Sequence, residues 1–415
     1  MSVKLLLNNF IMFSLVSSTG GLIFVFNRNV SYLFLFFTVL FGFFYVGKGL
    51  KKSNYYSALL SFTTLFVLFF CNYFFATNFQ SLTKYSFNII IILTTLFVFI
   101  YFNNQKKESL LNSLYFVLKL ILYHSVLSFL FYFFVSDDLF LISSQHHDSL
   151  VYNYLFYYSP KSASALNLFG IDLQRNAGIF WEPGILQIYL NILFFLELTF
   201  FNKNKSLLIL IIFAIISTYS TTGLFLILLQ IVYFSQKEYK RFSRLLILVL
   251  ITLPLYFLFN FNLSDKLYGQ KSSSFQKRLI DLTQPFYIAV ENPLTGIGLD
   301  LDSFQKEREE FYINSNINDA LFDYGLQQNL ETSSKGSTNS IMYVLAGMGF
   351  PTTILFLYML IKQQIVRRNR LLWISIIFIS VMSEPLLLRP FFFIFIISGF
   401  MYLFNRILES KSIKT

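Results

Sequence analysis

The stretch LNSLYFVLKLILYHSVLSFLFYFFV, residues Leu111–Val135, decides the fold class of this chain. Its 25 residues are almost all apolar, and Lys119 is the one Lys, Arg, Asp or Glu among them. A run of about 20 apolar residues is long enough to cross the hydrocarbon core of a bilayer as a helix. We therefore read this stretch as a transmembrane helix.

Similar apolar runs recur along the whole chain. Backbone polar groups find no partner in lipid, so each run that crosses the bilayer must be helical. We predict an all-α integral membrane protein with about twelve transmembrane helices. The predicted spans are Phe10–Phe26, Val30–Val46, Tyr55–Phe75, Phe87–Phe102, Leu111–Val135, Gly184–Phe201, Leu207–Tyr219, Thr222–Phe234, Leu245–Phe261, Ser340–Ile361, Leu371–Ser383 and Phe391–Asn405.

The composition supports this class. The chain of 415 residues is 55% hydrophobic and only 13% charged, whereas a soluble domain carries about 25% charged residues. Too little charge is present to cover a water-facing surface of this size. The single cysteine, Cys71, lies in an apolar run, so the chain cannot form an internal disulfide.

Residues 207–234 allow two interpretations: one long helix, or two short helices broken at the polar stretch STYSTTG, Ser217–Gly223. Lys203 and Lys205 precede this region, and Lys237 and Lys240 follow it. Basic residues prefer the cytoplasmic side of a membrane. Basic flanks at both ends imply an even number of crossings, so we predict two helices.

The charge distribution then predicts the orientation. With both ends in the cytoplasm, the cytoplasmic segments hold 19 basic and three acidic residues, and the outer segments hold 12 basic and 17 acidic residues. This asymmetry is the one expected for a protein of the cytoplasmic membrane. The net charge of +11 is therefore a topology signal and does not indicate a nucleic-acid partner.

Two outer segments are too long to be simple turns. We divide the single membrane domain into an N-terminal five-span region (1–135), a first outer loop (136–183), a four-span region (184–261), a large outer loop (262–339) and a C-terminal three-span region (340–415). Long loops are uncommon in compact proteins unless they have a function. We therefore expect the chemistry on the outer face.

The first candidate motif is RNAGIFWEPG, Arg175–Gly184, which closes the first outer loop. The Arg175 guanidinium presents a planar fork of donors suited to phosphate oxygens. Glu182 stands beside apolar residues, where a carboxylate can serve as a base. The alternative is an ion pair between Arg175 and Glu182 with Trp181 as an interfacial anchor.

The second candidate motif begins at Arg278 and Asp281 and ends with NPLTGIGLD, Asn292–Asp300. The apolar residues between them predict a short amphipathic helix on the outer surface. Pro and two Gly residues, Gly296 and Gly298, then predict a tight turn whose amides face an anion. The alternative is an ordinary surface turn.

The third candidate motif is the polar pair Thr338–Asn339, which leads into the span that starts at Ser340. The small residues Gly347 and Gly349 follow in that span, where close helix packing is the alternative interpretation. Glu384 and Arg389 precede the last span on the predicted outer side.

Taken in this order and at this spacing, the motifs resemble the family of O-antigen polymerases (Wzy) and O-antigen ligases. The resemblance runs from about Arg175 to Phe391 and includes the Ser/Thr-rich break at Ser217–Gly223. Ligase-like members tend to have a His directly before the Asn that ends the large loop. Here that position is Thr338, which favours the polymerase.

The resemblance implies a GT-C-like membrane glycosyltransferase of the bacterial cytoplasmic membrane, acting in lipopolysaccharide or other polysaccharide synthesis. Its substrate would be an oligosaccharide on undecaprenyl diphosphate, and a chain-length regulator is a further partner that the resemblance suggests. The reaction would invert the sugar C1 and need no metal or other cofactor.

We assign catalytic roles to Arg175, Glu182 and Arg278. The expected substrate-binding residues are Asn292, Gly296, Gly298, Asn339, Glu384 and Arg389. Two other functions stay open at this point. The chain is either an O-antigen ligase, which transfers the polymer to lipid A-core, or a flippase for lipid-linked oligosaccharides.

Overall fold

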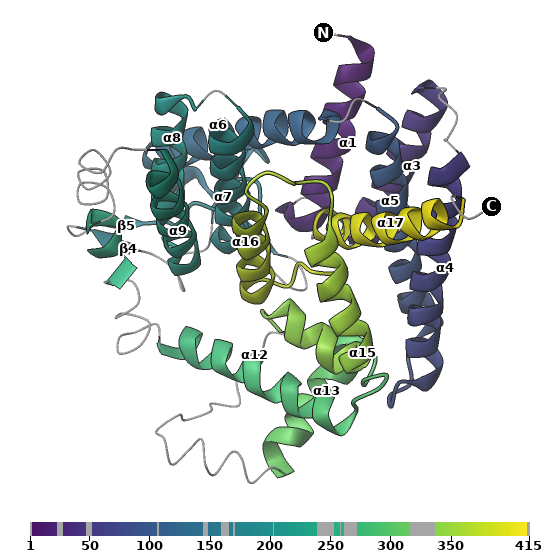
Figure 1. Cartoon of the computed structure of the whole chain (residues 1–415). Coiled ribbons are helices and arrows are strands. Elements are labelled where there is room, and N and C mark those ends of the chain that lie inside the picture. The colour runs from purple at the N-terminus through teal and green to yellow at the C-terminus, as the bar shows by residue number, and fades with distance from the viewer. Residues whose placement is uncertain are drawn as a thin grey trace. The chain divides into compact units, whose positions relative to one another are not determined.

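The computed structural model describes residues 2–22, 28–46, 52–105, 108–143, 148–158, 166–168, 171–201, 203–238, 253–257, 259–260, 272–314 and 337–412. Within these residues the chain is mainly helical, as predicted (Figure 1). It divides into two compact units. Unit 1 comprises Met1–Leu35, Gln105–Asp265 and Arg368–Ser380, and unit 2 comprises Phe36–Asn104, Lys266–Arg367 and Val381–Thr415.

Among the described residues, six helices are long and apolar enough to cross a membrane. They lie at Asn54–Phe75, Tyr85–Asn103, Ser109–Asp138, Pro183–Phe200, Ser340–Lys362 and Pro390–Ser410. Four shorter apolar helices lie at Val30–Tyr45, Lys205–Thr218, Thr221–Gln236 and Arg370–Ser383. The prediction of an all-α integral membrane protein is confirmed. Most of the span predicted at Leu245–Phe261 lies outside the described residues.

The first predicted span differs from the helix observed there. Helix α1 (Val3–Gly20) starts seven residues before Phe10, because the Ser2 side chain caps it by accepting from the Leu5 amide. It ends at Gly20, and the next residue, Gly21, pairs with Phe180 as an isolated β-bridge; residues 23–26 of the predicted span lie outside the described residues. The interior of α1 carries Asn and Ser residues that are buried within the protein.

Unit 1 is built around helix α7 (Pro183–Phe200). Helices α6 (Ser109–Val135), α8 (Lys205–Thr218) and α9 (Thr221–Glu238) pack against it, and α1 packs on α6. Tyr189 of α7 is fully buried, and its ring stacks on that of Phe180 with the centroids 4.9 Å apart. Pro183 occupies the first turn of α7, as its position in the sequence predicted.

The region between residues 207 and 234 contains two helices. Helices α8 and α9 are separated at Tyr219, whose φ of 48° is left-handed and cannot continue a helix. The prediction of a break in the Ser/Thr-rich stretch is confirmed. A left-handed residue is costly outside Gly, so the break must be held by contacts with the rest of unit 1.

Small sheets in the first outer loop are a feature that the sequence analysis missed. Strands β1 (Phe140–Ser143), β2 (Asp148–Tyr152) and β3 (Phe156–Tyr158) form an antiparallel sheet in that order. Strands β4 (Leu166–Leu168) and β5 (Ile171–Leu173) form a separate antiparallel pair. These strands are too short for the alternation of apolar and polar residues to be distinguished from the pattern of a helix.

Unit 2 is built around helix α17 (Pro390–Ser412). Helices α4 (Lys52–Phe75), α5 (Leu82–Asn103) and α15 (Ser340–Lys362) pack against it. Helix α12 (Ser272–Glu291) packs on α15 and carries the predicted amphipathic segment. Helix α13 (Leu301–Asn314) in turn packs on α12.

Candidate functional site

Arg175 and the neighbouring Asn176 attach the first outer loop to the break between α8 and α9. The Arg175 Nε–H donates to the carbonyl of Thr218 at 2.9 Å, and the side chain is half-buried. The last carbonyls of a helix have no partner inside the helix. The end of α8 therefore offers a backbone acceptor to the Arg175 guanidinium.

Asn176 is held by several hydrogen bonds in this part of unit 1. Its amide nitrogen donates to the carbonyl of Ser125 at 3.1 Å and to the Ser217 hydroxyl at 2.9 Å. Its backbone N–H donates to the Ser217 carbonyl, and its side-chain oxygen accepts from the Gly178 amide. Asn176 is 5% exposed. The segment before Glu182 is thus joined to both α6 and α8.

Two glycines of this region stand where a larger side chain would collide. Gly178 has a φ of 56°, and a Cβ there would lie 3.2 Å from the Cβ of Ser125. A Cβ on Gly223 at the start of α9 would lie 2.9 Å from the Cβ of Gln187. These close approaches explain the glycines by packing within unit 1.

Glu182 and Trp181 lie at the start of α7. Glu182 is the N-cap residue, yet its side chain makes no capping hydrogen bond and is exposed. The backbone N–H of Trp181 donates to the carbonyl of Gly20, which pairs this segment with the end of α1. The carboxylate of Glu182 is therefore accessible to a ligand.

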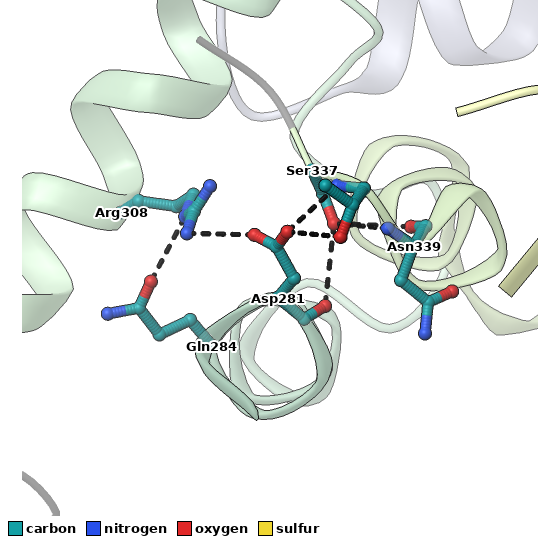
Figure 2. A network of polar contacts seen from close by, with 6 residues as sticks. Asp281, Gln284, Arg308, Ser337 and Asn339 are labelled. Atoms are coloured by element: carbon teal, nitrogen blue, oxygen red, sulfur yellow. Dashed lines mark hydrogen bonds and ion pairs between the residues drawn. The ribbon is translucent and has the colours of Figure 1, made fainter. Parts of the chain in front are cut away.

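In unit 2, Asp281 of α12 is the centre of a buried polar network (Figure 2). An oxygen of its carboxylate lies 3.1 Å from the Arg308 guanidinium of α13, and the two side chains are 0% and 3% exposed. The Nε–H of Arg308 also donates to Gln284 at 3.0 Å. Burial lowers the pKa of the Arg308 guanidinium, and the carboxylate beside it opposes that shift.

The other oxygen of Asp281 holds the residues before α15. It accepts from the backbone N–H of Thr338 at 2.8 Å and from the Thr338 hydroxyl at 2.6 Å. Asn339 is the N-cap of α15, and its side-chain oxygen accepts from the amides of Ile341 and Met342. Asn339 is buried and its carbonyl oxygen is engaged, so its position is explained as a helix cap.

The turn after α12 packs its backbone against α15. The amides of Ile297 and Gly298 donate to the carbonyls of Ala346 and Gly347, each at 2.9 Å. The amide of Gly296 donates within the turn to the carbonyl of Asn292. Since the Leu299 amide donates to Gln80, all four successive amides are used inside unit 2.

This arrangement corrects the expectation that the turn faces an anion. Gly296 and Gly298 have φ angles of 68° and 97°, and a Cβ on Gly296 would collide with the Ala346 carbonyl oxygen. Opposite the turn, α15 is interrupted at Gly349, whose φ is 76°. The glycines are therefore required by a backbone-to-backbone contact. The alternative interpretation of Gly349, close packing between helices, was wrong, because Gly349 lies against the backbone of the turn.

The same turn is anchored by α4 and the residues after it. Asn72 donates to the carbonyls of Thr295 and Gly347, each at 2.7 Å. Asn292 accepts from the Thr77 hydroxyl, and its amide nitrogen donates to the carbonyl of Ile288. Asn292 is thus held by two contacts inside unit 2, which limits the hydrogen bonds that it can offer to a substrate.

Glu384 and Arg389 precede α17 and lie near the start of α15. The Ser340 hydroxyl donates to the Val381 carbonyl and accepts from the Leu387 amide, which joins the two segments. Arg389 is close enough to Tyr343 of α15 to interact with it electrostatically. Glu384 is 6% exposed and Arg389 is half-buried.

The structure therefore divides the predicted residues between the two units. Arg175 and Glu182 belong to unit 1, and the other predicted residues belong to unit 2. Arg278 is exposed on α12, three residues before Asp281. Sequence reasoning missed Arg308, whose surroundings KEREE resemble an ordinary charged helix face. Sequence reasoning also found no sign that Thr338 contacts Asp281, since it considered this residue only as the position where ligase-like members tend to have a His.

The apolar helices and the polar networks at their ends define a multi-pass membrane protein. Residues 206–357 match the family model Wzy_C, described as O-antigen ligase. This segment is similar to the O-antigen polymerase and ligase family, which supports the resemblance of the motifs. Comparisons with curated proteins and with solved structures give no match.

The matched segment covers just over a third of the chain. It includes Arg278, Asp281 and Asn339, and the break between α8 and α9. Arg175, Glu182 and the segment Glu384–Arg389 lie outside it. The family that this segment matches is one of O-antigen polymerase or ligase activity in polysaccharide synthesis.

Proposed function

We propose that this protein is the polymerase that joins oligosaccharide repeat units carried on undecaprenyl diphosphate, at the outer face of the bacterial cytoplasmic membrane. The product would be an O-antigen, a capsule or an exopolysaccharide. The family match supports the polymerase and ligase class, and Thr338 carries the choice between them. Its hydroxyl donates to Asp281 at 2.6 Å, at the position where ligase-like members tend to have a His.

The proposed reaction transfers the growing glycan from its lipid carrier to the next repeat unit. The bond between sugar C1 and the diphosphate oxygen breaks, and an acceptor hydroxyl attacks C1 from the opposite face with inversion. The leaving diphosphate departs as an anion, so cationic donors stabilise the charge that develops. We assign this role to Arg175 and Arg278, each of which offers the forked donors suited to phosphate.

The acceptor hydroxyl must lose its proton, and Glu182 is our choice of base. Its exposed carboxylate at the start of α7 supports this choice, because a base must come within hydrogen-bonding distance of the proton. Asp281 is fully buried and already accepts from Thr338 and pairs with Arg308. We therefore propose a positioning role for Asp281 and keep Glu384 as the second candidate base.

The first test uses a strain in which the gene is deleted and supplied again on a plasmid. Loss of a polymerase leaves single repeat units attached to the acceptor, and gel electrophoresis of the glycans shows one short band. Loss of a ligase leaves no polymer on lipid A-core, while lipid-linked polymer accumulates. The second pattern would overturn the choice of polymerase and favour the ligase.

The second test separates an enzyme from a flippase. Purified protein in detergent is incubated with repeat units on undecaprenyl diphosphate, and the products are separated by length. Micelles have no two sides, so a flippase has no reaction to perform there. Longer glycans and released undecaprenyl diphosphate are expected for the polymerase. Unchanged repeat units, with protein that restores polymer in cells, would favour the transporter.

A further inference from the structure

The hairpin formed by β2 and β3 lies along helix α6, running from its end towards its middle. The Tyr158 hydroxyl donates to the Ser128 carbonyl at 3.2 Å, and the Phe131 ring packs on Phe156 with the centroids 5.0 Å apart. At the tip, His124 stacks on Phe156, and its Nε2–H donates to the carbonyl of Leu155 at 2.8 Å. The hairpin turn is therefore docked at the level of His124.

His124 lies deep in an apolar helix. The apolar stretch Ser109–Asp138 has 30 residues, which corresponds to about 45 Å, while a hydrocarbon core is about 30 Å thick and needs about 20 residues. If the hydrocarbon begins at Ser109, it ends near Ser128. If it ends at Asp138, His124 lies deeper still. In both cases His124 is inside the core, between about 6 and 15 Å from its nearer surface.

The side chains around the hairpin turn are those of a lipid-facing surface. On α6, Leu127 is 61% exposed and Phe134 is 82% exposed. On the turn, Tyr154 and Leu155 are each 66% exposed. None of the α6 residues between Lys119 and Asp137 is charged. Exposed apolar side chains of this kind are unfavourable in water and are matched by acyl chains. Asn153 is the exposed polar residue of the turn.

Several backbone groups of the turn have hydrogen-bond partners within the protein. Asn153 and Tyr154 have φ angles of 47° and 57°, the two left-handed residues of a tight hairpin turn. The Leu155 N–H donates to the Tyr152 carbonyl, and the Tyr154 carbonyl accepts from the Tyr157 hydroxyl at 2.6 Å. With His124 bonded to the Leu155 carbonyl, three backbone groups of the turn have partners within the protein: the N–H and the carbonyl of Leu155 and the carbonyl of Tyr154. Backbone groups in a membrane need such partners.

We propose that the β2–β3 hairpin is inserted into the leaflet next to the end of α6, with Tyr154 and Leu155 among the lipid acyl chains. His124 is the donor that makes the insertion possible, because it supplies the hydrogen bond that water would supply to an exposed turn. The partner of this surface is therefore phospholipid. The inference rests on the membrane class of the protein and is independent of the proposed polymerase activity.

The experiment measures the depth of a nitroxide label in lipid vesicles. In a Cys71→Ser background, single cysteines are placed at Leu155, at Leu127 as the lipid-facing control, and at Asp138 as the control at the end of α6. Full-length protein is reconstituted into phosphatidylcholine–phosphatidylglycerol vesicles. The ratio of collisions with oxygen to collisions with a soluble nickel chelate is then measured by electron paramagnetic resonance.

Leu155→Cys and Leu127→Cys are expected to give similar ratios, several-fold higher than that of Asp138→Cys. A ratio at Leu155 equal to that at Asp138 would place the turn in water and overturn the proposal. If Leu155→Cys is not produced, Tyr154→Cys takes its place with the same two outcomes.

The role of His124 is tested in the same labelled protein. His124→Ala removes the donor and is expected to lower the ratio at Leu155 towards that at Asp138, whereas His124→Gln keeps an N–H donor and is expected to preserve it. An unchanged ratio in His124→Ala would show that the hydrogen bond does not hold the turn in the leaflet.

Discussion

The attachment of Arg175 and Asn176 in unit 1 and the Asp281 network in unit 2 solve one problem in two ways. Each fixes a polar segment that leads into a transmembrane helix. In unit 1 Arg175 and Asn176 donate to carbonyls of the broken end of α8 and of α6. In unit 2 a carboxylate and a guanidinium are buried together, with exposed fractions of 0% and 3%.

This difference predicts how each region responds to substitution. Hydrogen bonds between neutral groups, such as those of Asn176, are lost one at a time, and each costs a moderate amount. A buried ion pair that loses one partner leaves a charge without compensation, which costs more than the pair itself contributes. Unit 2 is therefore expected to be the more sensitive of the two regions.

The largest effect is expected for the ion pair. Asp281→Ala leaves the Arg308 charge buried and is expected to lower the free energy of unfolding by about 3–5 kcal/mol. Denaturant titration in mixed micelles measures the change. The double variant Asp281→Ala/Arg308→Ala is expected to lose less than the sum of the two single variants, because their effects are coupled. Additive losses would show that the two side chains do not interact.

The next effect concerns the two proposed catalytic arginines. Arg278→Ala is expected to remove about 2–4 kcal/mol of transition-state stabilisation, a fall of about 30- to 1,000-fold in polymerisation rate, with normal protein level. Arg175→Ala is expected to lower the rate similarly and also the protein level, because its Nε–H holds the end of α8. Arg→Lys keeps the charge without the fork, so each such variant is expected to recover only part of the rate.

The matched control for Arg278 is Lys306→Ala on α13, an exposed cation of the same outer segment. It is expected to have almost no effect. Glycan length on gels and protein level in membranes are measured together. Full-length polymer from both Arg→Ala variants at normal protein level would refute the assignment of these arginines.

A smaller effect is expected at Thr338. Thr338→Val removes the hydroxyl that donates to the Asp281 carboxylate and is expected to cost about 1.5–3 kcal/mol of stability, as for a hydrogen bond to a charged group. Thr338→Ser keeps the donor and is expected to stay close to the parent protein. Thermal unfolding of both variants compares them directly. Equal stability of the Val and Ser variants would show that the Thr338 hydroxyl does not contribute to the network.

The hydrogen bonds of Asn176 in unit 1 are expected to contribute less to the free energy of unfolding. Asn176→Ala removes the donor to Ser125 and to Ser217 and is expected to cost about 1–3 kcal/mol. Ser217→Ala removes just one of these acceptors and serves as the matched control with a smaller loss. If Asn176→Ala cost as much as Asp281→Ala in the same titration, the proposed contrast between the two regions would be wrong.

No change is expected on addition of excess chelator to purified protein, since the proposed site uses arginines and a carboxylate. Transfer of labelled repeat units is measured with and without chelator. Activity that is lost and then restored by magnesium or manganese would contradict this expectation. It would direct attention to Asp300 and Asp302 of unit 2, whose spacing suits a metal better than that of the other predicted residues.

The two regions also differ in how far the sequence predicted them. Arg175, Asn176 and Glu182 stand in one continuous motif. The break that Arg175 and Asn176 contact was predicted from its polar residues and flanking charges. The contact itself was not predicted. In unit 2 the sequence indicated Asp281 and Asn339, yet the partner Arg308 lies 27 residues after Asp281 in a helix without a motif. The anion role of the Gly296–Gly298 turn was wrong because its amides are used inside the protein.

The sequence by itself determined the membrane class, most of the helices, the break between α8 and α9 and the family that the chain resembles. Hydrophobic length, helix breakers and motif order are local properties that can be read along a chain. Only the tertiary structure decided that Arg308 neutralises Asp281, that α15 opens at Gly349 to admit a turn, and that His124 holds a hairpin. Each of these depends on which distant segments meet, and a side chain finds its hydrogen-bond or charge partner only once they have met.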